Sequence, residues 1–173
     1  MTSDHRAAEV VAARPSLWVG QPVRRREDPR FLRGHARFVD DIVLPGMLHL
    51  AVVRSAVAHA HLRGISTDAA RRAPGVVAIL TASSLTGRAH PMPVRGAEGA
   101  RVAAVPHPLL GAGPARYVGE PVAAVLADSL VRAKDAAALV EIDYDSLPAV
   151  VDPAEALRGK VLLHDTLDSN VLV

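Results

Sequence analysis

The sequence contains no cysteine and few aromatic residues. Without thiolates the chain cannot form a disulfide, a cysteine-ligated iron–sulfur cluster or a thiolate zinc site, and it has no thiol nucleophile. Aromatic residues make up only 3% of the chain, which leaves little to stack on bases or sugars. No segment approaches the roughly 20 apolar residues of a membrane span, and residues 1–18 lack the apolar run of a secretory signal. We therefore expect a soluble, cytoplasmic protein that binds neither nucleic acid nor membranes.

Charge is distributed unevenly along a chain whose net charge is only +2. Residues 1–119 contain 16 Lys and Arg against 8 Asp and Glu, whereas residues 120–173 contain 4 against 10. Eighteen of the 20 basic residues are arginine, which an arginine-biased genome would explain by itself. Arginine is also enriched at protein interfaces, where lysine is depleted. On this second interpretation the N-terminal arginines form a partner interface, which consists of Arg24, Arg25, Arg26, Arg30 and Arg33.

Half of the residues are apolar, and the length suits one domain with a hydrophobic core. Apolar runs between turn signals predict strands, and apolar residues at helical spacing after a polar cap predict helices. In chain order we expect a strand at 47–55, a helix at 68–73, strands at 76–82 and 121–127, a helix at 129–140, a strand at 140–145 and a helix at 153–158. This order predicts an α+β fold with a mixed sheet and two strand–helix–strand units, whose shared order suggests a loose internal repeat. We expect a flexible tail at 1–17 and a single domain at 18–173.

Glycine and proline mark two irregular segments. Residues 20–41 are polar and rich in turn residues, and Pro29 and Gly34 are expected to interrupt any helix there. The few apolar residues of this segment are spaced as in an extended arm held against a larger body. Residues 86–114 form a loop with no sustained period, and a loop of this length is usually functional or held by a neighbour. No G-x-G-x-x-G follows a strand, which disfavours a dinucleotide-binding sheet.

Candidate metal ligands and nucleophiles are few. His59 and His61 could point to the same side of an extended segment, but no third ligand stands at helical or hairpin spacing. A structural zinc site normally needs four ligands, so a metal site is disfavoured. Ser83, Ser84 and Ser129 lie at predicted helix starts, where capping explains them, and no G-x-S-x-G motif is present.

The remaining candidates for catalysis are carboxylates. Glu27–Asp28 and Asp40–Asp41 are adjacent pairs, and neighbours on an extended chain point to opposite faces, so neither pair is expected to share a proton. Glu120 precedes an apolar run and could serve as a catalytic base, but Pro121 holds it extended, where its carboxylate could accept backbone N–H groups. We favour this structural role, because a lone carboxylate makes a poor active site. The residues alone assemble no active site, and they leave both an enzyme component and an interaction domain open.

Four stretches, taken in order, resemble one known family. They are GQPVRRREDPRFLRGHARFVDDIVLPGMLHLAVVRSAVAHAHLRGISTDAARRAPGVVAILTA, RYVGEPVAAVLAD, DAAALVEIDYDSLPAVVDPAEAL and HDTLDSNVL, and they span about Gly20 to Val173. Together they resemble the N-terminal α/β hammerhead domain of the molybdenum-binding large subunit in the xanthine dehydrogenase and aldehyde oxidase superfamily. The branch similar to carbon monoxide dehydrogenase is nearest. The resemblance is specific because many short motifs occur in the right order.

The resemblance implies a reaction that this chain would not perform alone. Enzymes of the family hydroxylate carbon centres, or oxidise carbon monoxide, with water and a molybdenum–pterin cofactor, and electrons leave through iron–sulfur clusters and usually FAD on other domains or subunits. The family's catalytic glutamate and pterin-binding glycines lie in domains without a counterpart here, so no catalytic, cofactor-binding or metal-binding residue is expected in this chain. Xanthine-type relatives do not carry glutamate at Glu120, which supports its structural role. The loop at 86–110 lies near the substrate funnel in some relatives, so Met92 and Leu109 are candidates for lining it.

The leading hypothesis is a hammerhead subunit, or a fragment of a longer subunit, of a molybdenum-dependent hydroxylase or dehydrogenase. It would assemble with the large chain that binds the molybdenum cofactor, with iron–sulfur and FAD subunits as further partners, and it would help to wall the substrate funnel. Two alternatives stay open at this point. One is a stand-alone protein-binding or regulatory module that reuses the fold. The other is a small independent enzyme that uses Glu120 with His59 or His61.

Overall fold

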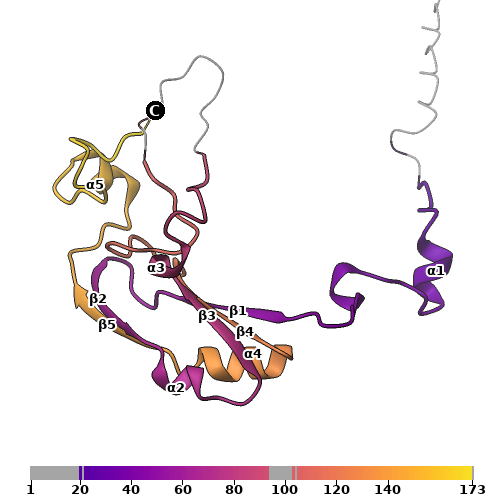
Figure 1. Cartoon of the computed structure of the whole chain (residues 1–173). Coiled ribbons are helices and arrows are strands. Elements are labelled where there is room, and N and C mark those ends of the chain that lie inside the picture. Colours follow the sequence, from indigo (N-terminus) through magenta and orange to yellow (C-terminus); the bar gives the residue numbers. More distant parts are fainter. Residues whose placement is uncertain (1–19, 21, 94–102, 104, 173) are drawn as a thin grey trace, which may run out of the picture. The chain divides into compact units, whose positions relative to one another are not determined.

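A computed structural model describes residues 20, 22–93, 103 and 105–172 (Figure 1). The chain divides into two compact units, Met1–Leu44 and Pro45–Val173. The expected tail at 1–17 lies outside the described residues, and the single domain at 18–173 stays a prediction. Within the described part, the longest helix has eight residues, and no helix there is long and apolar enough to cross a membrane.

The first unit contains the short helix α1 (Asp28–Leu32) and the 3-10 turn η1 (Val39–Asp41). The expectation that Pro29 interrupts any helix is wrong, because Pro29 lies in the first turn of α1, where a missing N–H costs no hydrogen bond. The carboxylate of Asp28 accepts the backbone N–H of Arg25 at 3.2 Å, and that of Asp41 accepts the N–H of Phe38 at 2.9 Å. One member of each carboxylate pair therefore holds a turn.

The second unit contains two small antiparallel sheets and the remaining helices (Figure 1). Its elements are β1 (His49–Arg54), β2 (Ala60–Ser66), α2 (Asp68–Arg71), β3 (Val76–Thr81), α3 (Ala82–Leu85), β4 (Pro121–Ala127), α4 (Leu130–Ala137), β5 (Glu141–Ser146) and α5 (Pro153–Leu157). One sheet has the order β1–β4–β3, and the other pairs β2 with β5. The predicted α+β class and hammerhead fold are confirmed, although β2 was not among the expected strands.

The strand before α2 is β2 and not the expected strand at 47–55, so the two strand–helix–strand units are β2–α2–β3 and β4–α4–β5. The two units exchange strands, and the loose internal repeat stays a prediction. The first unit begins in the two-stranded sheet and ends in the three-stranded sheet, and the second unit runs the opposite way. Each strand of one unit therefore pairs with a strand of the other, β2 with β5 and β3 with β4. Neither unit places both of its strands in one sheet, so neither forms a parallel crossover. The strand pairings are antiparallel in both sheets, whereas the sequence predicted a mixed sheet.

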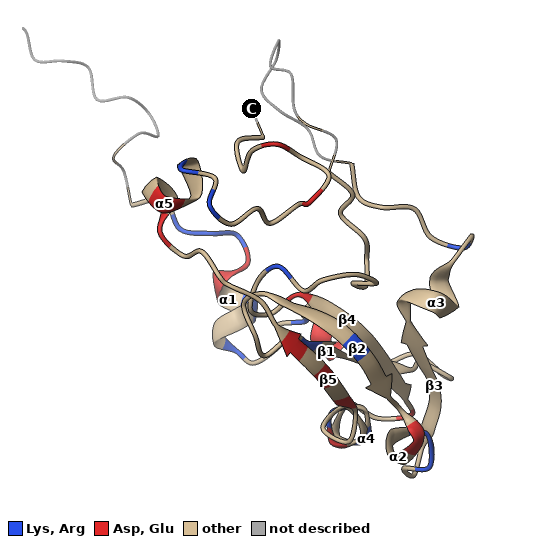
Figure 2. Cartoon of the chain, turned by 90° about the vertical axis from the view of Figure 1, so that its left-hand side faces the viewer, with Lys and Arg blue, Asp and Glu red and all other residues tan. Residues whose placement is uncertain are grey.

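The core lies between the three-stranded sheet and the helices α2 and α4, which lie side by side against it (Figures 1 and 2). Val125 of the central strand is fully buried and packs with Ile79 of β3, Ala70 of α2 and Ala136 of α4. Small alanines allow the helices to approach the strands closely, which suits a chain with few aromatic residues. Ser129 caps α4 by accepting the backbone N–H of Arg132 at 3.3 Å, as expected from the sequence.

Candidate functional site

Glu120 lies at the entry to β4, with only 6% of its surface exposed. Its Oε2 accepts the backbone N–H of Arg116 at 2.6 Å, and its backbone carbonyl accepts the N–H of Ser55 at 2.8 Å. The backbone of Gly111 passes over the carboxylate, so that a Cβ there would lie 3.3 Å from Oε1 of Glu120. The carboxylate thus holds a tight turn between the loop and the sheet, which is the structural role that the sequence favoured.

Arg116 extends this arrangement to a third segment of the chain. Its Nε donates to the carbonyl oxygen of Leu163 at 2.8 Å, and its Nη1 donates to that of Pro114 at 3.2 Å. Glu120, Arg116, Gly111, Ser55 and Leu163, here called the Glu120 junction, tie β1, β4, the loop and the C-terminal segment together. Within the described residues no buried side-chain nitrogen or oxygen lacks a hydrogen-bond partner. In the junction, Oε2 of Glu120 accepts a backbone N–H, and Nε and Nη1 of Arg116 donate to backbone carbonyls.

His59 and His61 line one hollow of about 360 Å³, together with Arg116, Lys160 and Asp165. The two histidines do share a side, as their spacing predicted. The Nδ1 of buried His59 lies 2.7 Å from the carbonyl oxygen of Pro148 and must donate to it, because a carbonyl only accepts. No group of three or more potential metal ligands occurs in the part of the chain that the structure describes.

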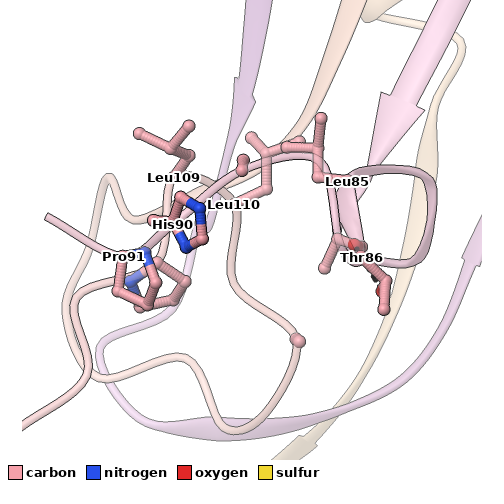
Figure 3. A pocket seen from close by; sticks show the side chains of 10 residues that line it. Leu85, Thr86, His90, Pro91, Leu109 and Leu110 are labelled. Atoms are coloured by element: carbon pink, nitrogen blue, oxygen red, sulfur yellow. Dashed lines mark hydrogen bonds between the residues drawn. The ribbon is translucent and has the colours of Figure 1, made fainter.

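Met92 and Leu109, the two funnel candidates, line different hollows. Leu109 lines a hollow of about 140 Å³ at the start of the loop, and Leu85 and Thr86 lie across from it with Leu110 between them (Figure 3). Met92 lines a second, apolar hollow of about 430 Å³ with His107, His164 and Leu172. The structure therefore does not bring the two candidates into one site, and their role in a funnel stays a prediction.

His164 adjoins both the second hollow and the Glu120 junction, and no motif in the sequence marks it as a candidate. Burial lowers the pKa of His164 below its usual value, and the nearby Arg116 guanidinium lowers it further, against the opposing influence of Asp165 and Glu120. A neutral imidazole is therefore favoured beside the junction. Arg116 was missed as well, because its partners Glu120 and Leu163 are revealed only by the fold.

Both units contain basic and acidic residues. Figure 2 shows acidic residues along β5, where Asp145 forms an ion pair with Arg63 of β2. The five arginines proposed as a partner interface are all exposed in the first unit, and the guanidinium of Arg30 lies 5.5 Å from the ring centre of Phe31. Their exposure is compatible with an interface, and that role stays a prediction.

Several of the candidate catalytic groups among the described side chains have structural partners. The carboxylate of Glu120 and the Nδ1 of His59 are both engaged with backbone groups. Ser84 bonds back to Thr81 at the start of α3, and Ser129 caps α4, so these serines have structural partners. What remains open to a ligand or partner is the set of largely apolar hollows beside the loop.

Comparison with known proteins places the chain in one family. The aldehyde oxidase and xanthine dehydrogenase a/b hammerhead domain matches residues 33–148. The 6-hydroxypseudooxynicotine dehydrogenase complex subunit gamma of Paenarthrobacter nicotinovorans is 42% identical, over 84% of this chain and 19% of its own length. Quinoline 2-oxidoreductase from Pseudomonas putida 86 has a TM-score of 0.78 at 39% identity, over 87% of this chain and 19% of that chain.

A further solved structure is that of the Cu,Mo-CO dehydrogenase, with a TM-score of 0.70 at 38% identity over 83% of this chain and 17% of that one. The chain thus spans about a fifth or less of the length of these relatives. The predicted resemblance, including the branch of carbon monoxide dehydrogenase, is confirmed. The chain belongs to the aldehyde oxidase and xanthine dehydrogenase family, as its α/β hammerhead domain.

Proposed function

We propose that this chain is the hammerhead component of a molybdenum-dependent hydroxylase or dehydrogenase and is inactive alone. It assembles with the polypeptide that carries the molybdenum cofactor, and its loop helps to wall the path of the substrate. The observation that carries this proposal is the extent of the match. Relatives up to 42% identical align with most of this chain, yet they are about five times longer than the part they share with it.

The chemistry of the described residues supports a scaffolding role. A catalytic base must reach a substrate, whereas Glu120 is only 6% exposed and its Oε2 accepts a backbone N–H at 2.6 Å. The same carboxylate joins the loop to the sheet, and Arg116 joins it to the C-terminal segment. Such a junction would stabilise the segments that surround an active site whose reacting groups lie on another domain or subunit.

The cofactors of the proposed complex would lie on other domains or subunits. One of the similar structures is a molybdenum- and copper-containing dehydrogenase, which favours a molybdenum–pterin centre in the assembled enzyme. Iron–sulfur clusters and FAD would carry the electrons away. Since this sequence has no cysteine, it could supply no thiolate to an iron–sulfur cluster. The described residues likewise supply no set of three metal ligands, so no reaction step is assigned to them.

The two hollows beside the loop support the second part of the proposal. Leu109 is 48% exposed and Met92 is 49% exposed, although both are large apolar side chains. Apolar side chains on the rim of a hollow suit either a substrate or a partner side chain. On the assembled enzyme the loop at 86–110 would contribute this apolar surface to the substrate path.

The test is to produce this chain, with an affinity tag, together with the polypeptide that carries the rest of the large subunit. We expect the two to co-purify in equal amounts and the complex to contain molybdenum, measured by mass spectrometry of the metal. The chain purified alone is the control, and it should contain no molybdenum and show no redox-active absorbance. Stoichiometric molybdenum in the isolated chain, or failure of the two polypeptides to associate, would overturn the proposal.

A further inference from the structure

The three-stranded sheet carries apolar side chains on both faces. Val53, Ile79 and Val125 point toward α2 and α4 and form the core on one face. Because successive residues of a strand point to opposite faces, the residues between them line the other face. A strand that is apolar on both faces, as β4 is, is typical of a sheet that is covered on both sides.

The register of the strands aligns the second face into rungs. Leu50 of β1 and Ala78 of β3 both pair with Leu126 of β4, and these three residues are here called the open rung. In the next rung, Ala124 lies between Val52 and Leu80.

The two rungs differ in exposure at β4 and at the β1 edge, while Val52 and Leu80 of the second rung are half-buried. Ala124 is only 5% exposed, whereas Leu50 is 51% exposed, and Leu48, two residues before it, is 42% exposed. Leu126 and Ala78 are half-buried. The second face is thus closed at one end and open at the other, and none of the open side chains carries a charge. Apolar surface that is left open at the end of an otherwise covered face indicates an interaction site.

The open rung is too small to hold a partner by itself. Leu48 and Leu50 together expose about as much surface as one leucine side chain, whereas a stable interface buries about 800 Å² on each partner. A patch of this size can act only as one part of a larger contact area. The relatives offer such a partner, because the matching region of quinoline 2-oxidoreductase is only 19% of a much longer chain.

We infer that the open rung is covered by an apolar segment of the polypeptide that carries the rest of the large subunit. This inference rests on the proposed function and adds the face by which the hammerhead domain docks. The partner segment presents aliphatic or aromatic side chains to Leu50 and Leu126, and it extends the closed part of the same sheet face. Because the contact is apolar, it should resist high salt.

The absence of cysteine allows a direct test. Leu50→Cys introduces a single thiol into the open rung, and Val151→Cys places one at a position that is 89% exposed, outside the sheet. Each variant is labelled with a maleimide, alone and in complex with the co-produced large polypeptide, and circular dichroism checks that the fold is kept. We expect the labelling rate of Leu50→Cys, relative to Val151→Cys, to fall by about tenfold or more on assembly, because the core of an interface is sealed from solvent.

The outcomes separate the two proposals. A complex that forms while the relative labelling rate stays unchanged overturns the docking face and leaves the proposed function intact. If no complex forms, the proposed function fails and the docking face fails with it. The isolated chain could also protect Leu50→Cys from the maleimide, with protection that rises with protein concentration as a dimer appears in analytical ultracentrifugation. That result would assign the open rung to a second copy and overturn the inference.

Discussion

The Glu120 junction and the hollow at Leu109 occupy the same stretch of chain, but their side chains meet opposite conditions. In the junction, a charged side chain is 6% exposed, and protein groups satisfy it. At the hollow, an apolar side chain is 48% exposed and has no cover. Protein groups that are satisfied internally are typical of scaffolding, and apolar groups left open are typical of contact surfaces. This stretch of chain therefore combines a carboxylate that the protein holds in place with an apolar side chain that is open to a partner or substrate.

The largest difference in unfolding free energy is expected between alanine variants of two neighbouring leucines in this stretch. Leu110 is 7% exposed and Leu109 is 48% exposed. Leu110→Ala should lower the free energy of unfolding by about 2–5 kcal/mol, because it leaves a cavity. Leu109→Ala should cost no more than about 1 kcal/mol, because much of that side chain is already in water. Urea denaturation of both variants measures the difference, and equal losses would show that Leu109 is as much a part of the core as Leu110.

The next largest difference in unfolding free energy is expected between two substitutions of Glu120 in the junction. Glu120→Ala leaves the part-buried N–H of Arg116 without its acceptor, which should cost about 1–3 kcal/mol of unfolding free energy. Glu120→Gln keeps an acceptor oxygen at the same place and should cost clearly less. Glu155→Ala, on exposed α5, is the control for loss of a carboxylate.

Denaturation in urea again measures these three variants. A loss from Glu120→Ala no larger than that from Glu155→Ala would contradict the scaffolding role of Glu120. A loss from Glu120→Gln as large as that from Glu120→Ala would instead indicate that the charge, and not the acceptor, stabilises the turn.

The sequence predicted the central parts of the fold best. The bounds of β4 agree with the expected strand at 121–127, because a strand buried on both sides reads as an unbroken apolar run. Strand β2 was missed, since its sequence AHLRGIS mixes basic residues and glycine, as an exposed strand of a two-stranded sheet can, and its register shifts between Leu62 and Gly64. Helix α4 buries its small residues, because Ala133 and Ala136 are fully buried, whereas Leu130 is 45% exposed.

The site was predictable only in part. The structural role of Glu120 followed from its place between a glycine and a proline, which are its immediate neighbours. Its link through Arg116 to Leu163 did not, because the two residues are 47 positions apart and only the folded chain brings them together. Likewise, Met92 and Leu109 lie on one loop in the sequence, but they line different hollows, and the backbone N–H of Met92 donates to the carbonyl of His107 at 2.9 Å.

The smallest effect is expected from His164, beside the junction. Burial and Arg116 lower the pKa of His164 in the folded protein, so the unfolded chain binds its proton more readily. The free energy of unfolding should therefore rise with pH between the lowered pKa and about 6.5, the value in the unfolded chain, and this contribution should be lost as the pH falls. His164→Gln should remove this part of the pH dependence, which is measured as the difference between wild type and variant across pH 5 to 7. A difference that stays constant would mean that Asp165 and Glu120 balance Arg116 and burial at this histidine, and one that falls with rising pH would mean that they outweigh them.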